Sequence, residues 1–320
     1  MKTTLITAVG SASAATVLQS LHAMGHRVIG CDIYPQAWNV VSTEVDAFFR
    51  AVLATDEEAY VNQLMDEVER EKIDYLIPLT DLEVDVLCRC KANFASLGCT
   101  VCTPDEPAAQ LCRDKQRMAE RLAAAAVCQT IPTRSPYGWE PEEQDFPMML
   151  KPRSGRSSQG QAVVRTREAF HSALQARKDY IAQPFIEGGV FTVDVARDLY
   201  GNTQCVVRQE LLRTVNGLGT TVRILPGHPL EKTCAAIAAQ AGIVGVVNME
   251  FIGHDNGYFF LEVNPRFSGG LGFSMAAGVD FTKLEILCHE GEFIGPRPDV
   301  REMTVSRRVE MVVTECSSAE

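Results

Sequence analysis

The chain has 320 residues, of which 46% are hydrophobic and 22% are charged, as in ordinary globular proteins. This length predicts two or three packed subdomains rather than one small core. A net charge of −11 argues against bulk attraction to nucleic acid or to an anionic membrane surface. No apolar stretch approaches a membrane span, and the run Leu5–Val9 is too short for a signal peptide, so we expect a cytoplasmic protein.

Eleven cysteines are many for a reducing compartment, but their spacing predicts no site. Cys99 and Cys102 form a CxxC pair inside an apolar run typical of a strand, where residues three apart point to opposite faces. No second pair lies at zinc-finger spacing, and an odd total cannot form a complete disulfide framework. We therefore expect small buried hydrophobic residues, with a metal or redox role as the alternative.

Residues 1–103 alternate between buried-strand runs and segments of helical spacing. Strict alternation of this kind predicts an α/β domain, a parallel sheet with helices on its faces. The expected strands are Leu5–Val9, Arg27–Asp32, Ile73–Pro78 and Cys99–Cys102, and the expected helices cover 12–24, 56–70 and a segment that begins at 82.

The rest of the chain divides into two further regions. Residues 104–186 are predicted to hold a helix at 114–126, a proline-rich connector, and strands on both sides of a Gly/Ser loop. Residues 187–320 are richer in strands, and His254–Gly257 has the composition of a tight hairpin turn. The tail is predicted to form a last strand at Thr304–Val313.

The first turn of the chain has a partial dinucleotide signature. Gly10 follows the first strand and Asp32 ends the second, as in dinucleotide-binding folds. Only one of the three fingerprint glycines is present, so close backbone approach to a pyrophosphate is not secured. The alternative is a doubly wound fold whose first turn happens to be tight.

A second phosphate-binding candidate is the loop that follows Lys151. The segment Lys151–Gly160 combines a strand-terminal lysine with small residues and arginines. Backbone N–H groups of such a loop can point at phosphate oxygens while the cations supply charge. The lysine precedes the loop, so the pattern is not a P-loop, and a basic surface hairpin is the alternative.

Two neighbouring strands carry a set of hard oxygen ligands. Residues two apart in a strand face the same side, so Glu262 and Asn264 project together, with Arg266 just beyond. The hairpin makes the strands neighbours, which allows Glu250 to lie opposite on the same face. Two carboxylates and an amide oxygen suit Mg²⁺, and the arginine could stabilise a phosphoryl group. Surface carboxylates are the alternative, but Glu262 interrupts an apolar run and needs a partner.

These strands resemble the metal-binding strands of ATP-grasp enzymes. The run Phe260–Arg266, preceded by Asn248–Glu250, is similar to segments of the carbamoyl phosphate synthetase large subunit and of the pyrrolysine-pathway amino-acid ligase. The resemblance implies a Rossmann-like preATP-grasp domain followed by a two-lobed, α+β ATP-grasp domain. The implied domains are 1–103 (preATP-grasp), 104–186 (N-lobe with the nucleotide lysines and the Gly/Ser loop) and 187–320 (C-lobe with the metal site).

The resemblance assigns nucleotide contacts along the chain. Val190 and Pro184 stand where many relatives carry acidic residues, so Asp194 is the candidate for ribose recognition, with a structural role as the alternative. The implied ATP-binding residues are Lys115, Lys151, Ser154, Gly155, Ser157, Ser158, Gly160, Gln183, Pro184, Phe185, Ile186 and Asp194.

The resemblance also implies a chemistry. A substrate carboxylate attacks the γ-phosphorus of ATP, and an amine then displaces phosphate from the acyl phosphate. Mg²⁺, with Mn²⁺ as an alternative, is expected at Glu250, Glu262 and Asn264, while Arg266 and, as a second candidate, Arg223 stabilise the phosphoryl oxygens. The expected partners are a small-molecule carboxylate and a small-molecule amine, not nucleic acid or a membrane, and a homodimer is allowed.

Substrate-binding residues are predicted on weaker patterns. Ser268, Gly269 and Gly270 follow Arg266, and glycine permits close approach of a substrate. Asp81 and Glu83 follow a strand of the open sheet, at the edge where such sheets bind ligands, and could meet a substrate ammonium. Helix capping is the alternative for both carboxylates.

Three other functions stay open on the sequence. One is a carbamoyl-phosphate-type kinase that acts on carboxyphosphate. Another is a nucleotide-binding protein without catalytic activity. The third is a nicotinamide-dependent oxidoreductase that uses Gly10 and Asp32.

Overall fold

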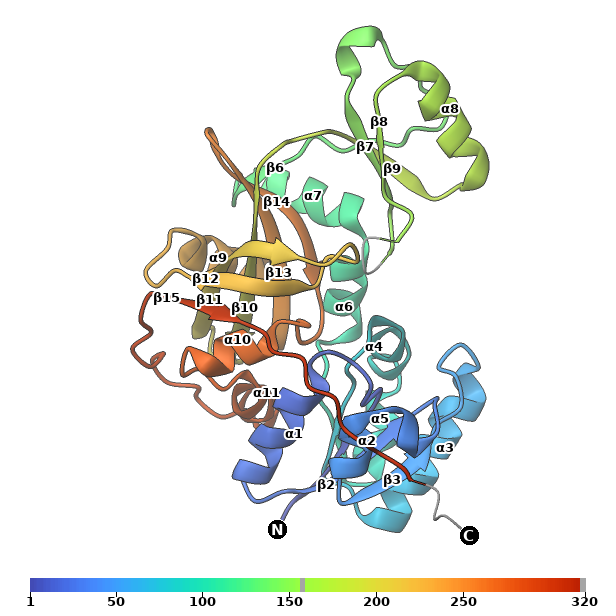
Figure 1. Cartoon of the computed structure of the whole chain (residues 1–320), viewed down its shortest axis with the longest axis vertical. Coiled ribbons are helices and arrows are strands. Elements are labelled where there is room, and N and C mark those ends of the chain that lie inside the picture. The colour runs from blue at the N-terminus through green and yellow to red at the C-terminus, as the bar shows by residue number, and fades with distance from the viewer. Residues whose placement is uncertain (156–158, 317–320) are drawn as a thin grey trace.

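The N-terminal region is a doubly wound α/β domain. The computed structural model of the chain describes residues 1–155 and 159–316 (Figure 1). Its first sheet is parallel, in the order β3-β2-β1-β4-β5. The strands are β1 Thr3–Ile6, β2 Arg27–Asp32, β3 Ala47–Arg50, β4 Tyr75–Ile77 and β5 Thr100–Val101, and the helices are α1 Ala14–Ala23, η1 Gln36–Trp38, α2 Val40–Glu44, α3 Glu57–Glu71, α4 Asp81–Leu87 and α5 Lys91–Ser96.

Neighbouring residues of β1 pack into different cores, which shows that both faces of this sheet are covered. Leu5 packs in a cluster with Leu64 of α3, whereas Ile6 packs in a cluster with Val17 of α1. The predicted α/β architecture is therefore confirmed. Cys99 and Cys102 flank β5 as buried thiols, and burial raises the pKa of Cys99 to about 12.

A small lobe projects from the rest of the molecule (Figure 1). It is a three-stranded antiparallel sheet in the order β8-β7-β9, with one helix. Met148, Leu150 and Phe170 belong to a core of its own. The elements are η2 Glu143–Asp145, β7 Met148–Pro152, β8 Ala162–Val164, α8 Arg167–Ala176 and β9 Tyr180–Pro184.

A seven-stranded sheet forms the centre of the molecule, in the order β15-β12-β11-β10-β13-β14-β6. Its strands are β6 Gln129–Thr130, β10 Gly189–Arg197, β11 Thr203–Arg213, β12 Gly219–Ile224, β13 Gly245–His254, β14 Gly257–Asn264 and β15 Met303–Ser306, and its helices are α6 Glu106–Arg113, α7 Lys115–Ala124, α9 Leu230–Gln240, α10 Leu271–Ala276 and α11 Phe281–Glu290. The hairpin expected at His254–Gly257 is present, because β13 ends and β14 begins at its two ends.

Two sequence expectations differ from the structure here. The helices α6 and α7 pack on the large sheet, where Leu111 and Met118 share a core with Phe260, so the first part of region 104–186 does not belong to the small lobe. The predicted strand Thr304–Val313 ends at Ser306. Its partner β12 begins at Gly219, only two residues beyond the last paired position, so the ladder runs out.

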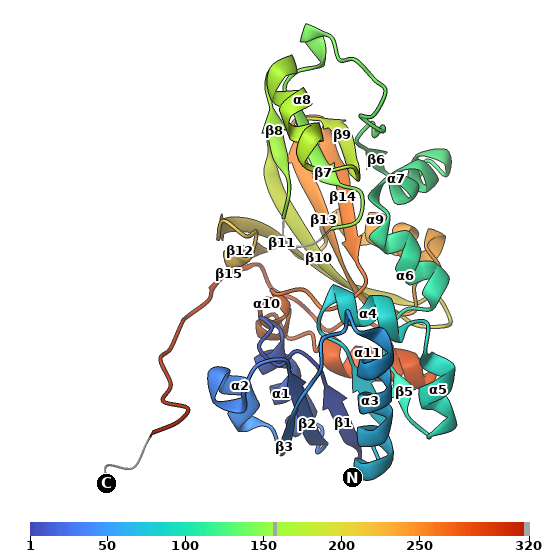
Figure 2. The ribbon, with the colours of Figure 1, turned by 90° about the vertical axis from the view of Figure 1, so that its right-hand side faces the viewer.

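The N-terminal domain and the large sheet share one continuous core. Figure 2 shows α11 between the parallel sheet and the large sheet. Leu21 of α1 and Leu284 of α11 belong to the same buried cluster as Val246 of β13. Ser20 adds a polar link, because its hydroxyl lies 2.8 and 2.7 Å from the two carboxylate oxygens of Asp280. Across the described residues, no helix combines the length and the apolar character needed to cross a membrane.

Candidate active site

A cavity of about 700 Å³ lies where the small lobe, the large sheet and the N-terminal domain meet. The small lobe contributes Lys151 of β7, and the large sheet contributes strands β10 to β14. The loop after β1 and the loop after β4 reach it from the N-terminal domain at Ser11–Ser13 and Leu79–Asp81. The parallel sheet therefore presents the carboxyl ends of two strands to the cavity, as open α/β sheets do.

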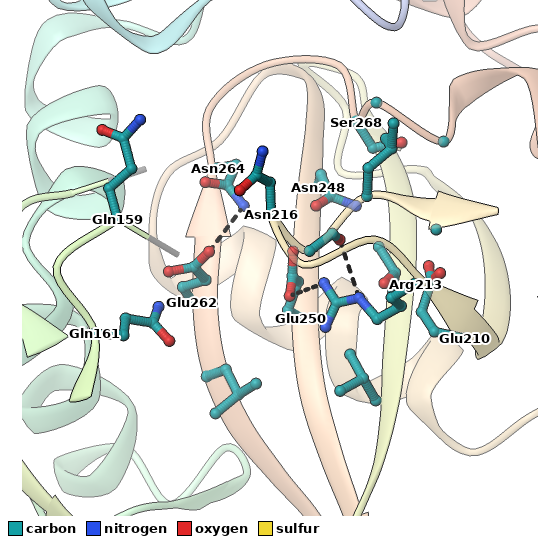
Figure 3. A pocket seen from close by; sticks show the side chains of 18 of the residues that line it. Gln159, Gln161, Glu210, Arg213, Asn216, Asn248, Glu250, Glu262, Asn264 and Ser268 are labelled. Carbon is teal, nitrogen blue, oxygen red and sulfur yellow. Dashed lines mark hydrogen bonds and ion pairs between the residues drawn. The ribbon is translucent and has the colours of Figure 1, made fainter. Parts of the chain in front are cut away.

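The predicted metal ligands meet on one wall of this cavity. Glu250 of β13 and Glu262 of β14 are directly paired across the antiparallel ladder, and Figure 3 shows their carboxylates side by side. Asn264 donates its side-chain N–H to Glu262 at 3.4 Å, which leaves its carbonyl oxygen for another partner. Two carboxylates and one amide oxygen are the hard donors that suit Mg²⁺, with waters and phosphate oxygens to complete its shell. The donor chemistry of this wall therefore suits the ion.

The charges on this wall shift one another's titration. Burial, followed by the nearby Glu262, raises the pKa of Glu250 to about 7. Burial also opposes ionisation of Glu262, but Lys115 and Lys151 hold its pKa below the ordinary value. Burial lowers the pKa of Lys151 to about 8 despite the adjacent carboxylates. The wall is thus a compact set of charges that partly compensate one another.

Lys115 contacts both β14 and the segment that follows β7. It is the first residue of α7, whose N-terminus is capped by Asp114, and its ammonium lies 3.1 Å from a Glu262 oxygen. The same ammonium donates to the Gly155 carbonyl at 3.3 Å. Arg153 binds Asp114 through two hydrogen bonds of 2.8 and 2.7 Å, which anchors the start of the loop. Of the other predicted loop residues, Ser154, Gly155 and Gly160 do not line the cavity, and Ser157 and Ser158 lie outside the described residues.

The segment between the lobes supplies a mainly apolar compartment. Gln183 to Ile186 all line the cavity, as predicted, and face Ile252 and Leu261 of the large sheet. Phe185 donates its backbone N–H to the Pro147 carbonyl at 3.0 Å, and Gln183 donates to the Thr133 hydroxyl at 2.7 Å. Both bonds fix the course of this segment. A flat apolar base fits such a compartment.

Arg266 connects the end of the cavity that holds the predicted metal ligands to the N-terminal domain. Its guanidinium donates to Asp81 at 2.9 Å and to the Phe267 carbonyl at 2.9 Å, and it lines the cavity. Asp81 also lies 3.3 Å from Arg113, so its carboxylate is already compensated by two cations. Asp81 lines the cavity and orients Arg266, and its contact with a substrate ammonium stays a prediction.

Three predicted residues lie away from the expected contacts. Glu83 is not in the cavity, because it completes the capping box of α4 with Thr80 and accepts a hydrogen bond from Tyr60 at 3.1 Å. Arg223 is half exposed and pairs with Glu302, outside the cavity. Asp194 is buried against Arg208 at 2.5 Å and does not line the cavity. Helix capping accounts for the position of Glu83, strand alternation for that of Arg223, and a buried ion pair for that of Asp194.

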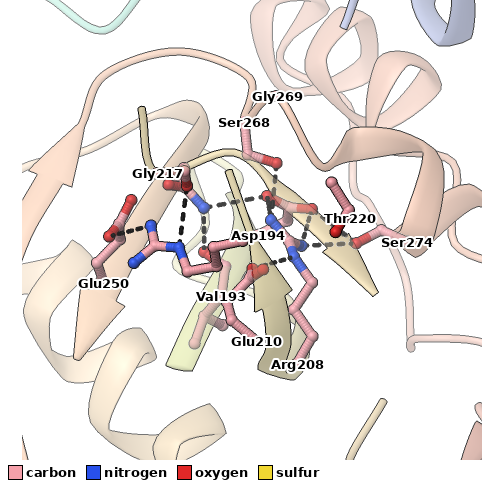
Figure 4. A network of polar contacts seen from close by, with 12 residues as sticks. Val193, Asp194, Arg208, Glu210, Gly217, Thr220, Glu250, Ser268, Gly269 and Ser274 are labelled. Carbon is pink, nitrogen blue, oxygen red and sulfur yellow. Dashed lines mark hydrogen bonds and ion pairs between the residues drawn. The ribbon is translucent and has the colours of Figure 1, made fainter. Parts of the chain in front are cut away.

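A network around Arg208 was not predicted from the sequence (Figure 4). Arg208 is fully buried and binds Asp194, Ser268 at 2.8 Å and Ser274 at 3.3 Å. Ser268 and Gly270 line the cavity as predicted, and a side chain at Gly270 would lie 3.0 Å from the guanidinium. A signal was available, because Arg208 and Glu210 stand two residues apart after the apolar run 205–207. That spacing directs both charged side chains to one face of β11.

The dinucleotide signature at the first turn is used internally. Asp32 accepts the backbone N–H of Gly10 at 2.8 Å and that of Tyr34 at 3.1 Å. A side chain at position 10 would lie 2.7 Å from Asn39. Glycine is therefore needed for packing, and the carboxylate closes the turn instead of facing a ribose. Gly10 and Asp32 therefore no longer support the alternative hypothesis of a nicotinamide-dependent oxidoreductase.

Two family descriptions match separate parts of the chain. Residues 4–102 match "PylC-like, N-terminal domain", and residues 176–315 match "ATP-grasp in the biosynthetic pathway with Ter operon". Among curated proteins, pyruvate carboxylase of Staphylococcus aureus is 30% identical over 176 residues, which is 47% of this chain. Carbamoyl phosphate synthase large chain of Thermomicrobium roseum is 23% identical over 282 residues, 82% of this chain. The chain spans only 15% and 26% of the length of these two relatives.

Solved structures share the fold over nearly the whole chain. A biotin carboxylase from Campylobacter jejuni, solved with an ATP analogue, superposes with a TM-score of 0.75 at 20% identity, over 92% of this chain and 72% of that one. An L-amino acid ligase from Bacillus licheniformis superposes with a TM-score of 0.74 at 16% identity, over 95% of this chain and 78% of that one. These likenesses show the fold of the chain, in which residues 4–102 match a PylC-like N-terminal domain and residues 176–315 match an ATP-grasp description.

Proposed function

We propose that this protein is a Mg²⁺-dependent ligase that uses ATP to join a small-molecule carboxylate to an amine through an acyl phosphate. One observation carries the proposal: Glu250 and Glu262 are paired across β13 and β14 and face the same cavity as Lys151. Ligands for a divalent cation and a cation for phosphate are thus held on opposing lobes. The fold shared with an L-amino acid ligase supports this reaction class.

The residues divide the work between the two lobes. The apolar compartment at Gln183–Ile186 receives the base, and Lys151 contacts the phosphates. Lys115 does not line the cavity, and it acts on the site through its ion pair with Glu262. Glu250, Glu262 and Asn264 would hold Mg²⁺, which when bound neutralises charge on the phosphate oxygens. Arg266, oriented by Asp81, faces the same space and stabilises the phosphoryl group in transfer.

The reaction then proceeds in two displacements. An oxygen of the substrate carboxylate attacks the γ-phosphorus, and the bond to ADP breaks. The amine nitrogen attacks the carbonyl carbon of the acyl phosphate, phosphate leaves with the bonding electrons, and the nitrogen loses a proton. Positioning and charge compensation supply most of the acceleration, and the enclosing lobes keep water from the acyl phosphate.

The test is a screen for ADP and phosphate release with Mg-ATP and pairs of amino acids, with mass spectrometry to detect the conjugate. Release of both products together with a condensed product is the expected result. ATP binding without turnover on a broad panel would instead favour a nucleotide-binding protein without catalysis. Phosphate release that needs bicarbonate would favour the carbamoyl-phosphate-type reaction.

A further inference from the structure

The far end of the cavity holds a carboxylate without a full set of partners. Glu210 of β11 lines the cavity, yet its side chain is only 4% exposed. Within the part of the chain that the structure describes, its Oε2 atom has no hydrogen-bond partner. An ionised oxygen in such a place is costly unless a donor reaches it. The unused acceptor therefore points to a donor that enters through the cavity.

The cations near Glu210 are already engaged with other groups. The Nε atom of Arg208 lies 3.5 Å from the other oxygen of Glu210 and makes no hydrogen bond among the described residues, whereas its terminal nitrogens bind Asp194, Ser268 and Ser274. Burial lowers the pKa of Arg307, and the charge of Glu210 partly offsets this effect, but the Arg307 guanidinium donates to the Gly269 carbonyl. Neither places an N–H on Oε2. The missing partner is therefore not supplied by the neighbouring described side chains.

The backbone around Glu210 directs its carboxylate toward the cavity. A bulge between Glu210 and Leu212 shifts the register of β11, which turns Arg213 toward the cavity and leaves Leu212 exposed. Arg213 then lies between Glu210 and Glu250 (Figure 3) and binds Glu250 at 3.4 Å. A methyl group at Gly219 would come within 1.9 Å of Glu210 Oε2, so the glycine leaves room for the carboxylate.

We infer that Glu210 accepts a hydrogen bond from the ammonium group of the amine substrate, an assignment that rests on the proposed ligase function. Before the attack the ammonium releases one proton to solvent, which frees the lone pair of its nitrogen, and Glu210 keeps a hydrogen bond to a remaining N–H. An ammonium offers three N–H donors and a positive charge, which matches a buried acceptor with a negative charge. A carboxylate at this position would be repelled. The two substrates are thereby sorted by charge, the amine beside Glu210 and the carboxylate beside the phosphates and Arg266.

The test separates activation of the carboxylate from capture of the amine. Glu210→Gln keeps the shape of the side chain and removes its charge, whereas Gly219→Ala keeps the charge and displaces the carboxylate. Hydroxylamine, which is largely uncharged at neutral pH, traps an acyl phosphate as a hydroxamate without needing an ammonium site. The standard amino acids serve as amine probes, and Glu302→Gln on the adjacent β15 side of the sheet is the matched control.

Both variants are expected to lower kcat/KM for the amine about 10- to 100-fold, the loss expected when a charged hydrogen bond is removed. Hydroxamate formation and its dependence on ATP should stay at the level of the unmodified protein and of the control. Equal losses in both assays would make Glu210 a structural partner of Arg208 and overturn the assignment, as would no loss in either. An unmodified protein that forms neither hydroxamate nor conjugate overturns the proposed function, and this assignment with it.

Discussion

At the β13–β14 end of the cavity, Glu250 and Glu262 meet because a short hairpin joins their strands. At the β11–β12 end, Arg208 is held by residues that lie 14, 60 and 66 positions away in the sequence. The first arrangement follows from the two-residue period of a strand. The second exists only once the whole sheet and α10 have assembled. One end of the cavity is thus encoded locally, and the other is a product of the complete fold.

The two ends of the cavity are therefore expected to contribute differently to turnover and to stability. The local end carries charges that compensate one another only partly, with the pKa of Glu250 raised and that of Lys151 lowered by burial. The distant end contains a closed ion pair, Asp194 with Arg208, whose atoms are almost wholly buried. Substitutions at the first should therefore affect turnover more than stability, and substitutions within the Asp194–Arg208 pair should do the reverse.

The largest effect is expected for Glu262→Gln. This change keeps the shape of a predicted metal ligand but removes the charge that Lys115 and Lys151 compensate. Turnover measured by ADP release should fall by about 10³-fold, the upper range for loss of a group that stabilises the transition state. Circular dichroism and thermal unfolding should show a folded protein. A folded variant with normal turnover would remove the metal site from the proposal.

Asp194→Asn probes the opposite end. It leaves Arg208 buried without its main counter-ion, so the free energy of unfolding should fall by about 3 kcal/mol in chemical denaturation. Asp179→Asn is the control, because its partner Arg177 is exposed and such pairs contribute at most about 1 kcal/mol. ATP affinity of the folded Asp194 variant should be little changed. A large loss of ATP affinity at unchanged stability would restore the ribose-binding role.

The same contrast explains how far the sequence could predict the site. Glu250, Glu262 and Asn264 lie on one face, as expected, because a two-residue period and one turn determine their relation, while their role as metal ligands stays a prediction. A nucleotide contact was predicted for Asp194 because nothing in the sequence of β10 indicates that its side chain pairs with Arg208 of β11. Glu83 could equally be a cap or a ligand, and only the position of Tyr60 from α3 decides between them.

Two other differences had signals that the sequence reasoning did not use. Arg223 stands between Val222 and Ile224, both fully buried, so alternation already predicts that it faces solvent. Helix α6 also escaped prediction, although Asp105 precedes Glu106 and Pro107 at its start, a typical beginning of a helix. The α/β domain was predicted well because alternating strands and helices leave few topologies.

Arg266→Lys and Arg223→Lys form a direct comparison of the two arginines predicted to stabilise the phosphoryl oxygens, of which Arg223 was the second candidate. Lysine keeps the charge at position 266 but cannot bind Asp81 and the Phe267 carbonyl with the same geometry. Turnover should fall about 10²-fold in the first variant and stay unchanged in the second. Both proteins should unfold at nearly the same temperature. Equal losses in the two variants would return Arg223 to the catalytic machinery.

The smallest effect is expected from pH at the metal site. Burial and Glu262 raise the pKa of Glu250 to about 7, so below that pH the group is mostly protonated and a divalent cation must displace the proton. Affinity for Mn²⁺, followed as free ion by electron paramagnetic resonance, should therefore fall by up to about tenfold per pH unit below 7 and level off above it. Glu250→Gln should bind Mn²⁺ more weakly and without this pH dependence. A steep dependence that persists in the variant would assign the titration to another group, and a flat profile in the unmodified protein would show that Glu250 is ionised throughout.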